Sequence, residues 1–453
     1  MKCIASKFAG PVFASTLACV FAANALPAED LSMSGFSLLN VYHMARESDP
    51  TLAMARYRVE GADAQRDVAR SKFFPQVSLF GDWSENTVRY EGNTLGQLPT
   101  QDYPGERYGL LLRSPLFNMR NFREYERRGA LVGQSERELA VAETELLAAV
   151  VQAYLAVLLA EESVAQLTTE LSALQTQLEE ANALYEKSLI PVTQVLETQT
   201  RVDTLRADLV NARGQSAISY ERLTQLTGSR EIKLQLVAER FSLASEVSSA
   251  DNAASLAHQF DPATAAAEEV VNAARKGIER EKGSWWPEVD FVYNAQYSDV
   301  GFDNLTSPPR NTETYSISMR YPLFEGGAGA ARLRGAWAEF YSAQQSLEAA
   351  KRQAGGRARA AWVNLESASE RVQAARQAVT TTEKNLDASR KAVKAGTARV
   401  TDVLLALAQN TRAQRDLSEA RFQRAMGWLE LELATGKDPL LLATEFSAAL
   451  HGR

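Results

Sequence analysis

Residues that commonly carry out chemistry are few and scattered in this chain. The three histidines, His43, His258 and His451, lie far apart among the 453 residues and form no metal-ligand spacing. The sequence contains no nucleophile elbow, HExxH helix, phosphate-binding loop or dinucleotide fingerprint. These patterns predict that the protein is not an enzyme and has no metal site and no cofactor.

The first 25 residues have the features of a secretory signal peptide. Lys2 and Lys7 precede an apolar run over residues 11–23, and Ala23-Asn24-Ala25 has small residues at the spacing that a signal peptidase accepts. We expect cleavage after Ala25, with Ala28 as the alternative. The mature protein is therefore expected to be exported.

Both cysteines, Cys3 and Cys19, lie in the segment that we expect to be removed. A mature chain without thiols excludes disulfides, thiolate metal sites and cysteine nucleophiles. Lipid attachment at Cys19 is the alternative, and it is disfavoured because Thr16 stands where a leucine is usual. Loss of two lysines changes the formal charge from −7 to −9 (−7 − 2), and this acidity argues against a nucleic-acid partner.

Two segments between residues 284 and 327 alternate apolar and polar side chains, as strands with one apolar face do. We predict strands at about 288–298 and 312–321, each near the roughly 10 residues that a tilted strand needs to cross a bilayer. No apolar run after the leader approaches the roughly 18 residues of a spanning helix. The exported chain is therefore expected to form a membrane barrel or, alternatively, a soluble protein with a solvated hairpin. The alternating apolar residues are Val289, Phe291, Tyr293, Ala295 and Tyr297 in the first segment, and Tyr315, Ile317, Met319 and Tyr321 in the second.

The second half of the chain repeats the first. Asp49-Pro50 recurs as Asp261-Pro262, and Phe73-Phe74-Pro75 as Trp285-Trp286-Pro287, both at an offset of 212 (261 − 49 and 287 − 75). Pro-Leu-Phe at 115–117 recurs at 322–324, an offset of 207 (322 − 115). We predict two tandem repeats of one architecture, and the first repeat has strands at about 76–88 and 107–115.

Two long helices are predicted over residues 117–188 and 324–395, which are rich in helix-forming residues and have few breakers. Each takes 71 steps (188 − 117 and 395 − 324), or about 105 Å at 1.5 Å per residue. Leucines and small residues spaced by threes and fours indicate coiled-coil seams with the returning helices. Gly355 and Gly356 predict a kink or a change of packing in the second long helix.

The predicted organisation is a signal peptide (1–25), a first repeat (26–228), an equatorial connection without helices (229–261), a second repeat (262–436) and an equatorial tail (437–453). Each repeat has a short helix, two strands, a long helix and a return helix. Four strands leave open edges that a membrane forbids, so several copies must share one barrel.

In the order and spacing of these motifs, the chain resembles the TolC-like outer membrane factors over nearly its whole mature length. The motifs are the Asp-Pro helix starts, the Phe-Phe-Pro and Trp-Trp-Pro joints, the Pro-Leu-Phe joints and the turn at 394–404. The resemblance implies a homotrimer with a 12-stranded barrel in the outer membrane, continuous with a periplasmic α-helical barrel. It also implies a passive duct that docks a periplasmic adaptor protein and an inner-membrane pump, either ABC-type or proton-driven.

The turns between long and return helices, at 188–193 and 395–402, face the adaptor in this family. The resemblance therefore makes Leu189, Ile190, Gly396 and Thr397 the candidate adaptor contacts. Exposed apolar residues at a turn also suggest a partner surface.

The same resemblance makes Asp402 a candidate for the acidic constriction of the closed periplasmic mouth. Leu405 stands where some members have a second aspartate, so the chain lacks the second acidic position of a double acidic ring. A residue that favours a helix start is the alternative role for Asp402. Arg399 is expected to pair with a neighbouring carboxylate at the mouth or, alternatively, to be a solvated arginine.

Aromatic residues stand at both helix-to-strand joints. Trp285, Trp286, Phe73 and Phe74 are expected to form a belt in contact with outer membrane lipid at its periplasmic side. The alternative is that they only pack the ends of the helices.

We interpret the chain as an outer membrane export duct. The opening of the mature chain, residues 37–45 before Asp49-Pro50, favours the type I protein secretion branch, and small-molecule efflux is the alternative. A non-conducting coiled-coil scaffold or adhesin is a third possibility. It is disfavoured because an anchor needs no strands in the middle of the chain.

Overall fold

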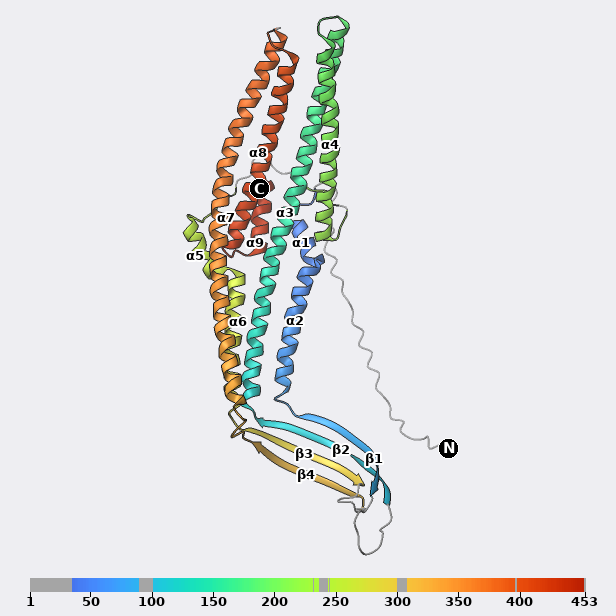
Figure 1. Ribbon diagram of the computed structural model, residues 1–453, viewed down its shortest axis with the longest axis vertical. Helices are drawn as coiled ribbons and strands as arrows, with labels where there is room; N and C mark the ends of the chain where they lie inside the picture. The colour runs from blue at the N-terminus through green and yellow to red at the C-terminus, as the bar shows by residue number, and fades with distance from the viewer. Residues whose placement is uncertain are drawn as a thin grey trace, which may run out of the picture.

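The structure, a computed structural model, describes residues 35–88, 101–230, 232–235, 243, 245–299, 308–395 and 397–451. These residues form a layer of long helices that joins a four-stranded sheet at one end (Figure 1). The predicted signal peptide lies outside the described residues.

The two Asp-Pro pairs begin the helices that lead into the sheet. They start α2 (Pro50–Ser71) and α6 (Pro262–Gly283). The Asp49 carboxylate accepts a 2.7 Å hydrogen bond from the Leu52 amide, and Asp261 accepts one of 2.8 Å from Thr264. Each carboxylate thus satisfies a free amide of the first turn, and the proline adds no further donor.

The four strands form one antiparallel sheet in the order β1-β2-β3-β4. They are β1 (Gln76–Val88), β2 (Gln101–Phe117), β3 (Glu288–Asp299) and β4 (Arg310–Arg320). β2 starts six residues earlier than predicted. Residues 101–105, which include Pro104, pair with β1 alone, because the pairing with β3 ends at Glu106. A proline without a donor is tolerated where a strand has one partner.

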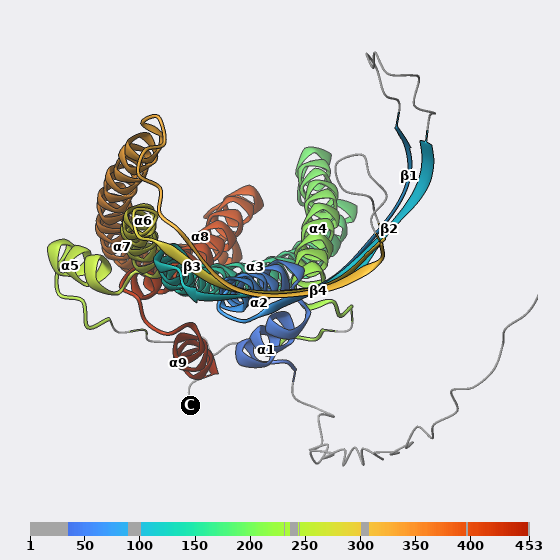
Figure 2. The ribbon, with the colours of Figure 1, turned by 90° about the horizontal axis from the view of Figure 1, so that it is seen from below.

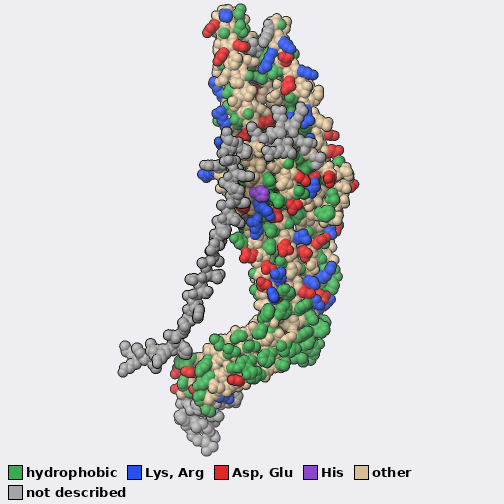
Figure 3. Space-filling model, turned by 180° about the vertical axis from the view of Figure 1, so that it is seen from behind, with side chains coloured by type: hydrophobic (Ala, Val, Ile, Leu, Met, Phe, Trp, Pro, Cys, Tyr) green, Lys and Arg blue, Asp and Glu red, His purple; other side chains and the backbone are tan. Residues whose placement is uncertain are grey.

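The strand pairing confirms the predicted faces of the sheet. Val77 pairs with Leu112, Leu112 with Tyr293 and Tyr293 with Tyr315, so one row of apolar side chains crosses all four strands. On the opposite face, a polar row consists of Asp82, Arg107, Ser298 and Arg310. The apolar face is open: Leu79 is 81% exposed and Ile317 70%. Figure 3 shows apolar side chains gathered over this end of the molecule.

Two helical hairpins make up the rest of the length. α3 (Met119–Glu186) returns as α4 (Val192–Thr227), and α7 (Ala328–Lys394) returns as α8 (Val400–Ala434). α3 has 68 residues, about 100 Å. α7 runs through Gly355 and Gly356 without ending. A Cβ on Gly355 would lie 2.5 Å from His258 Nε2, so this glycine admits a neighbouring side chain and the predicted change is one of packing.

The largest core lies at mid-length, where α1 (Leu38–Ser48) and α9 (Pro439–His451) pack beside α3 and α8. Figure 2 shows α1 and α9 on one side of the layer, which curves away from them. One described helix, α3, contains 18 residues apolar enough to cross a membrane, contrary to the sequence expectation, and half of that stretch is buried inside the chain. Val150 and Tyr154 are fully buried in this core. The stretch is apolar because it packs against helices on several sides.

The connection at 229–261 was expected to lack helices, and this expectation is wrong. It contains α5 (Ala250–Phe260), capped by a 3.2 Å hydrogen bond from the Asn252 amide to the Ser249 hydroxyl. The helix buries only small side chains, those of Ala253, Ala254 and Ala257. The buried face of α5 consists of alanines, and these alanines pack against alanines of α7.

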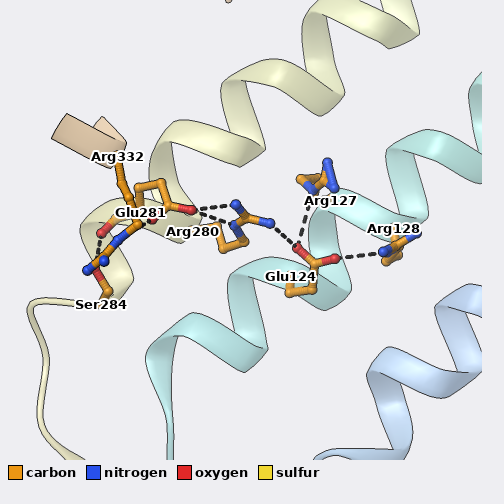
Figure 4. A network of polar contacts seen from close by, with 7 residues as sticks. All are labelled: Glu124, Arg127, Arg128, Arg280, Glu281, Ser284 and Arg332. Carbon is orange, nitrogen blue, oxygen red and sulfur yellow. Dashed lines mark hydrogen bonds and ion pairs between the residues drawn. The ribbon is translucent and has the colours of Figure 1, made fainter. Parts of the chain in front are cut away.

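Ionic contacts join α3, α6 and α7 next to the sheet (Figure 4). Glu124 of α3 lies 3.2 Å from Arg280 of α6 and also binds Arg127 and Arg128. Glu281 is buried and pairs with Arg280 and with Arg332 of α7. Three helices are thus tied together where the chain enters the sheet.

The environment of Glu124 predicts a pH dependence of stability. Burial alone would raise the pKa of this carboxyl, but Arg127, Arg128 and Arg280 together lower it below its ordinary value. A lowered folded-state pKa contributes stability that is present above the unfolded pKa of about 4.3 and is lost as the pH falls through the folded pKa. In Glu124→Gln protein we expect a lower Tm at pH 7, with the difference from wild type shrinking towards pH 3.

The measurement is thermal unfolding of detergent-solubilised protein from pH 7 to pH 3. Glu339→Gln, which removes an exposed carboxylate of α7, is the matched control and should follow wild type throughout. A Tm difference for Glu124→Gln that stays constant down to pH 3 would contradict this account.

Candidate functional site at the hairpin tips

The first tip is a tight turn between α3 and α4 that exposes apolar side chains. Ser188 has φ of 57°, and the Leu189 amide donates to the Leu184 carbonyl at 2.9 Å to close the turn. Leu189 is 66% exposed, whereas Ile190 is half-buried. The turn geometry therefore directs Leu189 outward.

Neighbouring apolar residues extend this surface beyond the two that the sequence singled out. Tyr185, Val192 and Leu196 are also exposed. Val192 and Leu196 are four residues apart on α4 and so lie on one helix face. That spacing is visible in the sequence, where the two residues are separated by Thr193, Gln194 and Val195.

The second tip brings Asp402 and Arg399 together through the backbone. The Arg399 amide donates to Asp402 Oδ2 at 2.9 Å, so the carboxylate caps the start of α8. Asp402 is nevertheless exposed. This geometry supports the helix-start role, and it leaves the carboxylate open to solvent as a mouth would require.

The structure says less about the other candidate residues of the second tip. Thr397 donates from its amide to the Ala392 carbonyl at 3.0 Å, and its side chain is exposed. Gly396 lies outside the described residues. Among the described residues, no carboxylate is within ion-pair distance of the exposed Arg399 guanidinium, so its expected partner stays a prediction. Leu405 is exposed on α8, three residues after Asp402.

A buried carboxylate joins the two hairpins before they separate. Glu170 of α3 is 3% exposed and lies between Arg201 of α4 and Arg415 of α8, with both Oε-to-Nη2 distances 3.5 Å. Figure 1 shows the two hairpins apart at their tips. Glu170 lies 16 residues before the end of α3, or about 24 Å at 1.5 Å per residue.

Further polar contacts strengthen the same junction. The Ser418 hydroxyl of α8 donates to Glu162 of α3 at 2.5 Å, and Gln166 donates to Ser418 at 3.4 Å. Burial, together with a hydrogen bond to Glu161, raises the pKa of the Tyr220 hydroxyl of α4. The sequence did not reveal the junction between the two hairpins, because the residues that form it lie up to 256 positions apart.

The four aromatic residues of the expected belt all lie where the helices meet the sheet. Phe73 packs against Tyr125 with ring centroids 5.8 Å apart, and Trp286 packs against Phe117 at 6.2 Å. All four side chains are exposed in the single chain. These contacts show packing at the helix ends, and the lipid belt stays a prediction.

Comparison with known proteins gives a consistent picture. The family described as "Outer membrane efflux protein" matches residues 41–229 and 253–437. The chain is 25% identical over 404 residues to outer membrane protein TolC of Vibrio cholerae, covering 88% of this chain and 90% of that protein. It is 24% identical over 437 residues to the proteases secretion protein PrtF of Dickeya chrysanthemi, covering 92% and 94%.

A solved structure shows the same fold. The CmeC outer membrane channel of Campylobacter jejuni superposes with a TM-score of 0.75 at 16% identity, covering 94% of each chain. At this identity the likeness concerns the fold alone.

The Glu170 junction predicts that Arg415→Ala loosens the hairpins towards their tips. Removing one of two partners of a buried carboxylate should cost about 1–3 kcal/mol, which corresponds to roughly 5- to 150-fold faster local amide exchange. Hydrogen exchange read by mass spectrometry should show this acceleration in α4 and α8 around the junction. Arg352→Ala, which removes an exposed arginine paired only with Glu348, is the control. Unchanged exchange at the junction would contradict the prediction.

Proposed function

The chain belongs to the outer membrane efflux protein family, and from this premise we propose that three copies form the exit duct of a tripartite export system. The protein is an outer membrane channel protein, with its helical part in the periplasm. The proposal adds the trimer, the partners and the type of cargo. It assigns the chain no catalytic role.

The main support for a barrel shared by three copies is the four-stranded sheet. It has one apolar face and four strands, and in the described residues β1 and β4 each have one unpaired edge. Unpaired backbone amides and carbonyls cost several kcal/mol each in a bilayer, so a spanning sheet has to close on itself. Three copies would supply 12 strands, with the apolar face towards lipid and the polar face around a water-filled pore.

The helical layer supports a duct that continues into the periplasm. It runs on from the sheet for about 100 Å and curves away from α1 and α9 (Figures 1 and 2). Three curved helical layers side by side would enclose a passage that continues the pore of the barrel into the periplasm. Phe73, Phe74, Trp285 and Trp286 would then lie at the periplasmic surface of the membrane as its aromatic belt.

The hairpin tips are the proposed docking region for the adaptor. The turns between α3 and α4 and between α7 and α8 are at the end of the helices opposite the sheet (Figure 1). We propose that Leu189, Ile190, Gly396 and Thr397 of these turns contact the adaptor. The exposed Val192 and Leu196 enlarge the apolar surface available there. A periplasmic adaptor would bind this surface and connect the duct to an ABC or proton-driven pump.

For the cargo, we favour protein secretion of the type I kind. The support is the relative PrtF, whose name assigns it to protease secretion, together with the opening segment before Asp49-Pro50. Small-molecule efflux is the second candidate, because the family description names efflux.

The proposed duct predicts a conductance that depends on Asp402. Three such carboxylates around one axis should attract cations and make a small conductance cation-selective. In planar bilayers, we expect Asp402→Ala to raise the conductance or reduce the selectivity for cations. Asp387→Ala, which removes an exposed carboxylate of α7 paired with Lys391, should leave both unchanged.

The outcomes separate the parts of this proposal. Conductance that is indifferent to Asp402→Ala would retain the duct and discard Asp402 as its gate. Absence of any channel from folded, membrane-inserted trimers would support the scaffold alternative.

The cargo is tested in cells that lack this protein. Type I secretion predicts that one or a few proteins disappear from the medium while tolerance of toxic small molecules stays unchanged, and that resupplying the chain restores them. Unchanged secretion with a lowered tolerance would instead favour efflux.

A further inference from the structure

We propose that the concave face of the helical layer carries a binding groove for amphipathic organic cations, at the level where α8 ends and α6 begins. An apolar floor would hold the body of such a molecule, and the carboxylate of Glu430 would hold its ammonium group. The inference rests on the proposed function in one respect, because that function makes the concave face the wall of the passage.

Two neighbouring cavities form the groove. The larger has a volume of about 640 Å³ and lies among α3, α7 and α8, and the smaller, of about 390 Å³, also includes the start of α6. Asn364 of α7 and Glu430 of α8 line both, so the cavities meet there. Each volume is within the range of roughly 300–1,000 Å³ that is usual for small-molecule sites.

A change of helix inside the layer accounts for this hollow. α3 and α7 each contact both α6 and α8. α8 ends at Ala434 and α6 starts at Pro262, and both of these residues line the smaller cavity. Because one helix replaces another between the same two neighbours, their side chains leave space at the junction.

The groove opens on the side of the layer that faces away from α1 and α9. Trp428 of α8 packs against Phe446 of α9, with ring centroids 5.7 Å apart. Two residues turn an α-helix by about 200°, so Glu430 points to the opposite side of α8. Figure 2 shows α1 and α9 on the convex side of the layer, so the groove lies on the concave side.

The same relation holds along α3. Val150 and Tyr154 are fully buried in the core that contains α1 and α9, whereas Gln152, two residues from each, is exposed. Gln152 lines the larger cavity. Glu145 lines the smaller cavity, two residues before the fully buried Leu147. Both α3 and α8 therefore place the groove on the concave face.

The floor of the larger cavity is apolar. Leu155 is buried, and Phe422 and Met426 are half-buried beside it. Aromatic and thioether side chains offer a large apolar surface, and the flexible methionine adapts to ligands of different shape. Three lining residues with small side chains or none leave the cavity deep: Ala156, Ala368 and Gly427.

The charges that line the groove are those of four carboxylates and two guanidinium groups. Both guanidinium groups already have a partner among these carboxylates. Arg371 lies 3.9 Å from Glu419. Arg357 lies 3.4 Å from the buried Asp261. The groove therefore has an excess of negative charge.

Glu145 and Glu430 are the two carboxylates that remain. In the described part of the chain, no cationic group lies within ion-pair distance of either. Burial raises the pKa of Glu430, and no neighbouring positive charge offsets this effect. A partly buried carboxylate without a partner is stabilised by a cation that also covers the apolar floor. An anion of the same size would be repelled.

Binding is tested with two probes that share the dansyl fluorophore, in purified protein in a non-ionic detergent. Dansylaminoethyl-trimethylammonium carries a quaternary ammonium group, and dansylamide is neutral. Dansyl fluorescence rises in apolar surroundings, so a titration corrected for protein-free detergent gives a Kd for each probe. We expect wild type to bind the cationic probe at least about tenfold more tightly than dansylamide.

Two variants separate the effect of charge from that of shape. Glu430→Gln keeps the shape of the side chain, so we expect the Kd of the cationic probe to rise at least about tenfold and that of dansylamide to stay unchanged. Ala368→Trp fills the larger cavity and should weaken the binding of both probes. Glu366→Gln is the matched control. Glu366 is exposed and lies two residues after Asn364, so it points away from the groove and should not affect either Kd.

The place of the groove in the passage is tested by single-channel current in planar bilayers. The cationic probe, added to the solution on both sides, should reduce the current because it would occupy part of the passage. Glu430→Gln should raise the concentration for half-maximal block by the same factor as the Kd.

Each outcome decides the inference. Weaker binding of the cationic probe and weaker block in Glu430→Gln, with neither change in Glu366→Gln, support it. Equal binding to wild type and Glu430→Gln by protein that still conducts overturns the groove while the duct stands, and so does a bound probe that leaves the current unchanged. A peptide of phenylalanines and lysines that binds where the cationic probe does not would overturn the small-molecule assignment. Binding that depends on Glu430 in folded trimers without conductance would support the site and overturn the proposed function.

Discussion

The hydrogen-bonding demand of backbone groups in a bilayer is the constraint on which the rest of this structure depends. Four antiparallel strands satisfy each other's amides and carbonyls except along β1 and β4. Water can form hydrogen bonds with the unpaired amides and carbonyls of such an edge, but the hydrocarbon of a bilayer cannot. An outer membrane protein with this sheet therefore needs further strands, and the chain offers no others among its described residues. The proposed trimer meets this demand.

The tandem repeat suggests a simple way to pair the free edges of β1 and β4. The contact between the two repeats already shows how a strand pair and a helix pair fit side by side, so a second copy can extend the same pattern.

The helical part uses buried charge in a different way. Glu124 and Glu281 tie three helices together beside the sheet, and Glu170 ties the two hairpins together far from it. A carboxylate held by guanidinium groups from two helices fixes their separation, and it opposes motion until one contact breaks. Beyond Glu170 the hairpins carry no such link in the described residues.

The sequence by itself determined the features that depend on neighbouring residues: the Asp-Pro helix starts, the alternating faces of the strands, the long helices and the tandem repeat. Helix capping at Asp49 and the side-chain period of two in β3 are local effects, so residue types and spacing suffice. Only the tertiary structure decided the rest. It placed α5 in a connection expected to be irregular, set His258 against Gly355 and surrounded Glu170 with Arg201 and Arg415. These contacts join residues from 31 to 245 positions apart, and no local pattern encodes which distant helices will meet.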